Sequence, residues 1–161
     1  MEIETIYREY FYDIFRFLLA LSRNESLSEE LTQETFLKAL KNNDQFDGRK
    51  DIRAWLFAIA RNTYYRYCKR NSIFVGEEFL EDLQDPTPQT VDLIIERETI
   101  QRIEHNACKL PEPYRQVFHL RIYGNLSFEQ IGIVYGKSAG WARVTYFRAR
   151  KMIQSEMEKE K

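Results

Sequence analysis

The chain has 161 residues, of which 43% are hydrophobic and 30% are charged, and its formal net charge is −1. This length fits one ordinary domain or two small ones, and the composition excludes a disordered or fibrous chain. No apolar run approaches the roughly 20 residues that a membrane span requires, and the first residues lack the pattern of a secretory signal. We therefore expect a cytoplasmic protein in which Cys68 and Cys108 are free thiols.

Three helices are predicted in the first 70 residues. Apolar side chains recur at helical spacing over residues 3–21. The capping-box pattern of Ser26 and Glu29 is expected to start a second helix. The third covers residues 51–70, DIRAWLFAIARNTYYRYCKR. Strand patterns are absent from the sequence, so this part is predicted to form a small helical bundle.

The third helix combines aromatic rings with cations. One side is the expected core stripe, and the opposite side carries Phe57, Arg61, Tyr64, Tyr65 and Cys68. Exposed rings among arginines would form a platform on which the bases of single-stranded nucleic acid stack. We therefore expect Phe57 and Tyr65 to be more exposed than Trp55 and Ile59. The alternative is that these rings pack on the linker or on a second domain.

Charge and proline content divide the chain. Residues 73–92 are acidic and contain two prolines, which predicts a flexible acidic linker between a domain at 1–72 and a second at 93–161. Residues 76–106 carry 2 basic and 9 acidic side chains, whereas residues 107–161 carry 10 and 5. Basic regions on either side of an acidic one indicate a nucleic-acid partner.

The last 35 residues read as two helices joined by a tight turn. Ser127 and Gln130 form a capping-box pattern, and Ser138 is an acceptable N-cap for the final helix. That helix has one apolar stripe and a basic outer face, as a helix-turn-helix that enters the DNA major groove would have. A plain helical hairpin with a solvated face is the alternative.

The sequence contains no catalytic motif that we recognise. Glycine-rich phosphate loops, nucleophile elbows and zinc-protease motifs are missing. His105 and Cys108 have a spacing that two zinc ligands could use, but no second pair accompanies them. We therefore expect a protein that is not an enzyme and has no metal, no cofactor and no small-molecule substrate.

Four segments, in order, resemble the bacterial extracytoplasmic-function (group IV) sigma factors of the sigma-70 superfamily. They are LSEELTQETFLKAL (27–40), FDGRKDIRAWLFAIARNTYYRYCKR (46–70), LPEPYRQVFHLRIYGNLSFEQIG (110–132) and GKSAGWARVTYFRARKMI (136–153). The resemblance implies an all-α fold of two small helical domains, a region 2 bundle and a region 4 helix-turn-helix.

The resemblance also implies a function and partners. The chain would bind RNA polymerase core through its beta-prime clamp and beta flap and direct it to promoter DNA. It would capture the melted minus-ten strand and read the minus-thirty-five duplex. In this family an anti-sigma factor, frequently membrane-anchored, often holds the free protein. The alternative is a stand-alone helix-turn-helix regulator that binds duplex DNA without polymerase.

The side chains and the resemblance together give three sets of expected site residues. The resemblance alone implies the set that binds core polymerase, which is Gln33, Glu34, Phe36 and Leu37. The set expected to contact minus-ten DNA is Phe46, Gly48, Arg49, Lys50, Arg53, Phe57, Arg61, Asn62 and Tyr65. The set expected to contact minus-thirty-five DNA is Ser138, Trp141, Arg143, Val144, Phe147, Arg148 and Lys151.

Overall fold

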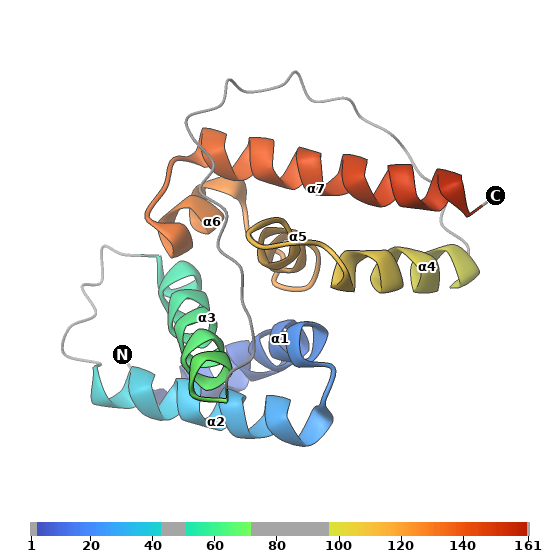
Figure 1. Ribbon diagram of the computed structural model, residues 1–161. Helices are drawn as coiled ribbons and strands as arrows, with labels where there is room; N and C mark the ends of the chain where they lie inside the picture. Colours follow the sequence, from blue (N-terminus) through green and yellow to red (C-terminus); the bar gives the residue numbers. More distant parts are fainter. Residues whose placement is uncertain (1–2, 43–50, 72–96, 161) are drawn as a thin grey trace.

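The computed structural model describes residues 3–42, 51–71 and 97–160, and every regular element in these ranges is a helix. The first part contributes α1 (Ile3–Ser22), α2 (Glu25–Lys41) and α3 (Ile52–Arg70). The second part contributes α4 (Arg97–Cys108), α5 (Tyr114–Ile122), α6 (Phe128–Tyr135) and α7 (Ala139–Lys159). Figure 1 shows the two groups stacked on one another. The all-α, two-domain prediction is confirmed, while the predicted linker at 73–92 lies outside the described residues.

Helices α1 and α2 are joined by a two-residue turn. Arg23 adopts a left-handed conformation (φ 56°), and Asn24 caps α2 by accepting a hydrogen bond from the Leu27 backbone N–H at 3.0 Å. The capping box predicted at Ser26 is therefore wrong, and Ser26 is an exposed residue inside the helix. The helix starts earlier because the Asn24 amide oxygen already satisfies a first-turn donor.

Two predicted caps of the second domain are confirmed. Ser127 and Gln130 form a reciprocal capping box at the start of α6, and the Ser138 hydroxyl accepts from the Trp141 N–H to cap α7. Between them, Gly136 ends α6 in the left-handed region (φ 67°), where a side chain would be strained. Helices α6 and α7 thus form the predicted helix-turn-helix.

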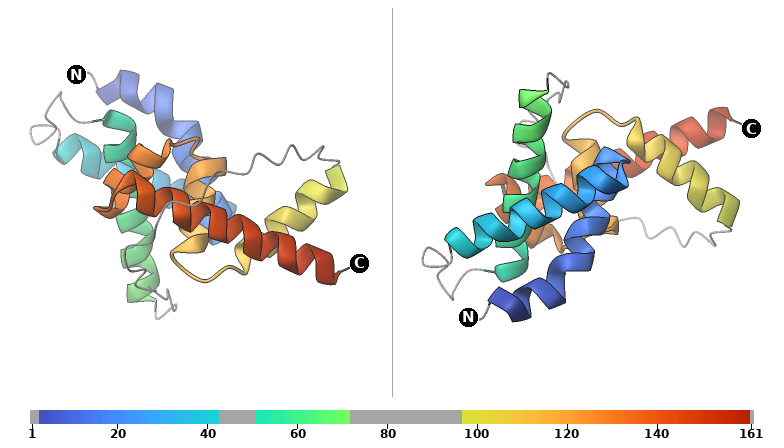
Figure 2. Two further views of the ribbon diagram at one scale, coloured as in Figure 1. Left: turned by 90° about the horizontal axis from the view of Figure 1, so that it is seen from above. Right: turned by 90° about the horizontal axis from the view of Figure 1, so that it is seen from below.

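The two domains share one continuous core. Helix α3 packs against α6, and α1 packs against α5. Figure 2 shows α7 lying across the assembly, with the N-terminal helices beneath it in the view from above. Phe17, Phe57, Leu120 and Ile131, which come from both domains, are among the fully buried side chains. The face of α3 that the sequence suggested for nucleic acid therefore lies in a domain interface.

Candidate nucleic-acid and polymerase interfaces

Phe57 is fully buried, so the prediction that its ring is exposed is wrong. The ring packs edge-on against Phe17 at a centroid distance of 5.4 Å, and on another side it meets Gly124 of the second domain. Tyr64 is also buried, which bears out the alternative that rings of α3 pack on the second domain. Tyr65 is half-buried, as are Trp55 and Ile59.

Arg53 links the first turn of α3 to both domains. Its Nε donates to the Gly124 carbonyl at 3.0 Å, and its Nη2 forms an ion pair with Asp13 at 2.9 Å. The guanidinium also lies over the rings of Tyr10 and Phe57. In this arrangement the predicted DNA-binding arginine is occupied by protein groups.

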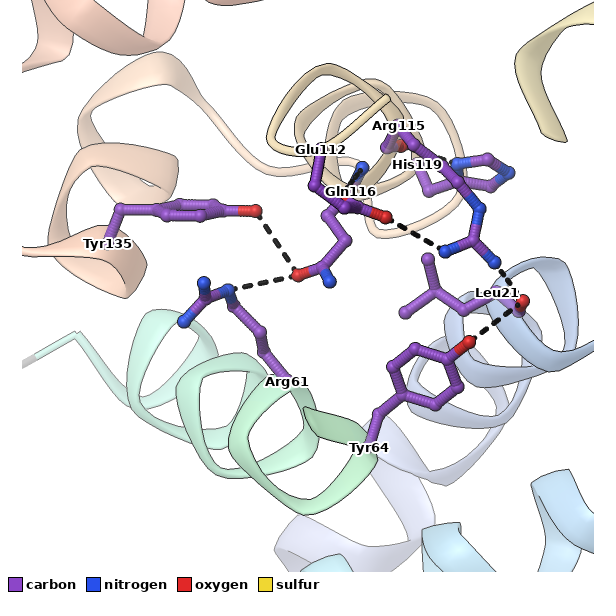
Figure 3. Close-up of polar contacts among 8 residues, drawn as sticks. All are labelled: Leu21, Arg61, Tyr64, Glu112, Arg115, Gln116, His119 and Tyr135. Atoms are coloured by element: carbon purple, nitrogen blue, oxygen red, sulfur yellow. Dashed lines mark hydrogen bonds and ion pairs between the residues drawn. The ribbon is translucent and has the colours of Figure 1, made fainter. Parts of the chain in front are cut away.

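Arg61, two turns further along α3, is held in the same way by the second domain. Its Nε donates to Oε1 of Gln116 at 3.0 Å, and its guanidinium lies 4.1 Å from the centroid of the Tyr135 ring. The Tyr135 hydroxyl donates to the same Gln116 oxygen at 3.2 Å (Figure 3). Because Gln116 is 2% exposed, this contact is shielded from water.

A second polar cluster joins the end of α1 to α5 (Figure 3). Arg115 pairs with Glu112 at 2.9 Å and donates to the Leu21 carbonyl, which also accepts from the Tyr64 hydroxyl at 3.3 Å. Burial raises the pKa of Glu112, against the opposing effect of the Arg115 guanidinium. Burial likewise raises the pKa of Tyr64. Arg115 of the second domain thus provides a donor for the Leu21 carbonyl near the end of α1, where carbonyls lack partners within the helix.

The caps of α3 and α6 are bonded to each other. Asp51 caps α3, because its Oδ1 accepts from the Ala54 N–H at 3.1 Å. Its Oδ2 accepts from Nε2 of Gln130 at 2.8 Å, while Oε1 of Gln130 accepts from the Ser127 N–H at 2.9 Å. Asp51 and Gln130 therefore each use one side-chain atom to cap their own helix and another to bond to the other domain.

His119 lies where α5 faces α1. Its ring is 1% exposed, and its Nδ1 is 2.6 Å from the Arg115 carbonyl oxygen. Burial, together with the nearby charges of Arg115 and Arg23, lowers the pKa of His119 to about 4. Beside it is a cavity of about 320 Å³, lined from the first domain by Arg16, Leu19, Ala20 and Arg23. The imidazole is neutral at physiological pH.

Other residues expected at the minus-ten strand differ in accessibility. Asn62 is exposed on α3, close to the cations Arg66, Lys69 and Arg70, which are also exposed. The expected residues Phe46, Gly48, Arg49 and Lys50 lie outside the described part of the chain.

The expected polymerase-binding set on α2 is divided by the structure. Gln33 and Leu37 are exposed, and Glu34 is half-buried in an ion pair with Lys38 at 3.2 Å. Phe36 is 5% exposed, so its predicted place on the polymerase-facing surface is wrong. It is buried because its ring packs on Tyr7 and Phe11, at centroid distances of 5.0 and 6.2 Å.

Leu40 is an exposed apolar residue that the expected set omitted. It is 49% exposed and lies one turn beyond Leu37, which is 57% exposed. The sequence held a signal for this, since apolar residues at 36, 37, 39 and 40 span too wide an arc to share one buried face. Leu37 and Leu40 form an exposed pair on α2.

The expected minus-thirty-five set on α7 is also divided. Ser138, Arg148 and Lys151 are exposed, and Arg143 and Phe147 are half-buried. Figure 1 shows α7 along one edge of the molecule.

Trp141 and Val144, predicted to face the groove, are buried at 7% and 2% exposure. The Trp141 ring packs on Tyr135 at 5.0 Å. Val144 is a short apolar side chain, flanked at helical spacing by the larger Trp141, Phe147 and Arg148. Both side chains are buried because the removal of apolar groups from water is favourable.

Among the described residues, no group of three His, Cys, Asp or Glu side chains could hold a metal ion. None of their helices is long and apolar enough to cross a membrane.

Comparison with known proteins gives consistent results. The family model of sigma-70 region 2 matches residues 6–73, and that of sigma-70 region 4 matches residues 101–153. The chain is 29% identical to the RNA polymerase sigma factor YlaC of Bacillus subtilis, over 98% of this chain and 92% of the relative. It is 30% identical to the ECF RNA polymerase sigma factor EcfG of Rhodopseudomonas palustris, over 86% of this chain and 76% of the relative.

A solved structure has the same fold. It is the sigma factor RpoE in complex with the anti-sigma factor NepR from Bartonella quintana, with a TM-score of 0.71, 21% sequence identity and 96% coverage of both chains. The two family models and the sequence relatives indicate the same family, and the fold is that of a solved sigma factor. The chain belongs to the ECF sigma factors of bacterial RNA polymerase.

Proposed function

We propose that this sigma factor captures the melted minus-ten strand on α3 and reads the minus-thirty-five duplex with α7. The observation that carries the proposal is that one chain contains both sigma-70 regions in order, with cationic surfaces on both helices. A stand-alone regulator needs only the helix-turn-helix, so region 2 argues against that alternative. The chain supplies recognition, and the chemistry of RNA synthesis belongs to the polymerase in the cytoplasm.

Helix α7 has the features of a duplex reader. Exposed Arg148 and Lys151 lie one turn apart, and the half-buried Arg143 lies nearer the helix N-terminus. Arginine in the major groove can donate to the two acceptors of guanine, and lysine can neutralise phosphate. The indole Nε1 of Trp141 is buried and has no hydrogen-bond partner in the described structure.

Helix α3 has the features of a strand binder. Arg53 and Arg61 supply positive charge, and exposed Asn62 supplies amide donors and acceptors that can read a base edge. Arginine planes and aromatic faces can both stack with unpaired bases, at about 1–3 kcal/mol per base. This use of α3 requires the second domain to move away from it.

The exposed pair Leu37 and Leu40, with Gln33 on the same helix, is the surface that we assign to the beta-prime clamp. Exposed leucines on a soluble domain are typical of protein-binding surfaces. The second domain would contact the beta flap. An anti-sigma factor is a further partner of this chain in our proposal, because the solved neighbour of the same fold is a complex with one.

The test is selection of promoters with bacterial core polymerase from a DNA pool with random minus-thirty-five and minus-ten boxes. We expect open complexes only when both proteins are present. Arg148→Ala should relax the selected minus-thirty-five bases, at a cost of about 1–3 kcal/mol, and leave the minus-ten bases unchanged. Tight duplex binding by the chain alone, with no effect of core polymerase, would refute the proposal.

A further inference from the structure

We infer that the cavity beside His119 is a binding site for a phosphate group, free or carried by a small molecule, and that Arg16 and Arg23 hold it. The cavity has a volume of about 320 Å³, which is the size of a ligand site rather than of a single buried water. Its lining comes from α1 and the turn after it, from α4, and from the end of α5. Neither α3 nor α7 contributes to it, so the inference does not depend on the proposed function.

Arg16 and Arg23 give the cavity its positive charge. Both side chains are exposed, and in the part of the chain that the structure describes neither forms an ion pair with a carboxylate. The Arg16 guanidinium lies 5.5 Å from the centroid of the Tyr12 ring and 5.6 Å from that of Tyr123. Contacts with aromatic faces orient a guanidinium without neutralising its charge. Both arginines therefore remain available to an anion.

The buried imidazole beside the cavity adds no charge. His119 lines the cavity, and burial, with the nearby arginine charges, lowers its pKa to about 4. Its Nδ1 lies 2.6 Å from the Arg115 carbonyl oxygen, so in the neutral ring this nitrogen carries the proton and donates. The positive charge at the cavity wall therefore comes from the two arginines.

Two guanidinium groups match a ligand with two negative charges. A phosphate monoester carries a charge of about −1.5 to −2 at pH 7, and the planar fork of arginine donors fits phosphate oxygens. A monocarboxylate would neutralise only one of the two arginines. Leu19 and Ala20 also line the cavity and provide apolar contact for the organic part of a phosphorylated molecule.

Two other features of the cavity oppose an anion and limit its affinity. Glu104 is a carboxylate in the lining, and it accepts a hydrogen bond from the Tyr123 hydroxyl at 2.7 Å. Helices α1 and α4 both end beside the cavity, and the C-terminus of a helix favours cations. The two arginines outweigh the single carboxylate in formal charge. We therefore expect weak binding, which Glu104→Gln should make tighter.

The test is a titration of the full chain with inorganic phosphate, followed by phosphorus NMR and by the alkylation rate of Cys108 with uncharged iodoacetamide. Cys108 is half-buried and lines the cavity, whereas Cys68 is fully buried, so alkylation reports on the cavity. We expect saturable broadening of the phosphate signal and alkylation that slows in proportion to the occupied fraction. Sodium chloride at the same ionic strength should leave the alkylation rate unchanged.

Matched charge variants locate the bound phosphate. Arg16→Gln and Arg23→Gln should each weaken binding about fivefold, which is the upper range for the loss of an exposed ion pair. Arg8→Gln removes the same charge from α1 at an exposed position that does not line the cavity, and it should bind phosphate as the unaltered chain does. All three arginines are exposed, so we expect each variant to fold, as judged by circular dichroism.

Three outcomes would overturn the inference. They are the absence of saturable phosphate binding, binding that leaves the alkylation of Cys108 unchanged, and equal binding by the double variant of Arg16→Gln and Arg23→Gln. Adenosine 5′-monophosphate distinguishes the two sources of the phosphate group. Tighter binding than that of phosphate would assign the site to a phosphorylated small molecule, and equal or weaker binding would assign it to free phosphate. Failure of the proposed function is a separate result, since it is measured by open complexes with core polymerase.

Discussion

Acid should destabilise this protein through one buried imidazole, that of His119. The ring is 1% exposed, and burial, together with the charges of Arg115 and Arg23, lowers its pKa to about 4. In the unfolded chain the imidazole would have its ordinary pKa of about 6.5. Below that value the unfolded state takes up a proton that the folded state refuses, so stability falls as the pH falls from about 7 to 4.

The size of the effect follows from the two pKa values. Between pH 7 and pH 5 the imidazole should remove about 2 kcal/mol of unfolding free energy, and close to 3 kcal/mol once the pH reaches 4. Glu112 acts in the opposite sense. Burial raises its pKa, so its contribution is present at low pH and is lost as the pH rises through the folded value. A comparison with a variant that keeps Glu112 cancels this second effect.

The assay is urea unfolding at pH 7, 6 and 5 for the unaltered chain and for His119→Phe. Phenylalanine keeps a ring against Tyr123, which stacks on His119 at 5.6 Å, but it cannot take up a proton. We expect the difference in unfolding free energy between the two proteins to change by about 2 kcal/mol from pH 7 to pH 5. The exposed His105, replaced by glutamine, is the control. A difference that is constant across this range would refute the burial of His119.

Two further predictions test corrections that the structure makes to the sequence reading. Phe57→Ala should lower the unfolding free energy by about 3–5 kcal/mol, because it removes a large ring from the core. Asn62→Ala, on the exposed side of α3, should change it by less than about 0.5 kcal/mol. Equal effects of the two variants in thermal denaturation would contradict the burial of Phe57. Asn24→Ala should lower the unfolding free energy by about 1 kcal/mol, because it removes the N-cap of α2. Ser26→Ala should leave that free energy nearly unchanged in urea titrations. The reverse order would show that Ser26 is the cap.

Local signals in the sequence were sufficient for the helices of the second domain. The capping box at Ser127 and Gln130 and the cap at Ser138 involve residues within three positions of each other, so their spacing alone identifies them. At the start of α2, Asn24 and Ser26 are both good cap residues only two positions apart. Propensity does not choose between them, and only the folded structure shows that Asn24 is the cap.

Local signals in the sequence could not predict which residues cover the surface of α3. Arg53 meets Gly124, and Arg61 meets Gln116, at separations of 71 and 55 residues. A helical pattern shows that a ring and an arginine share a side of a helix, but it does not show what covers that side. The helical pattern therefore predicts Phe57 on the solvent-facing side, and only the packing of the second domain makes that side part of the core.

The caps of α3 and α6 are independent of the bond that joins them across the interface. Asp51 and Gln130 keep their roles as caps of α3 and α6 when the bond between them breaks, because each uses a different atom for its cap. Separating the two domains would remove the contact of Gly124 with the Phe57 ring and the hydrogen bond of Arg61 to Gln116. A ring and an arginine that become accessible together can each stack with an unpaired base, and such stacking contributes about 1–3 kcal/mol per base. Under the proposed function, a melted strand would therefore compensate for the contacts that the second domain gives up, whereas duplex DNA, whose bases are already stacked, would not.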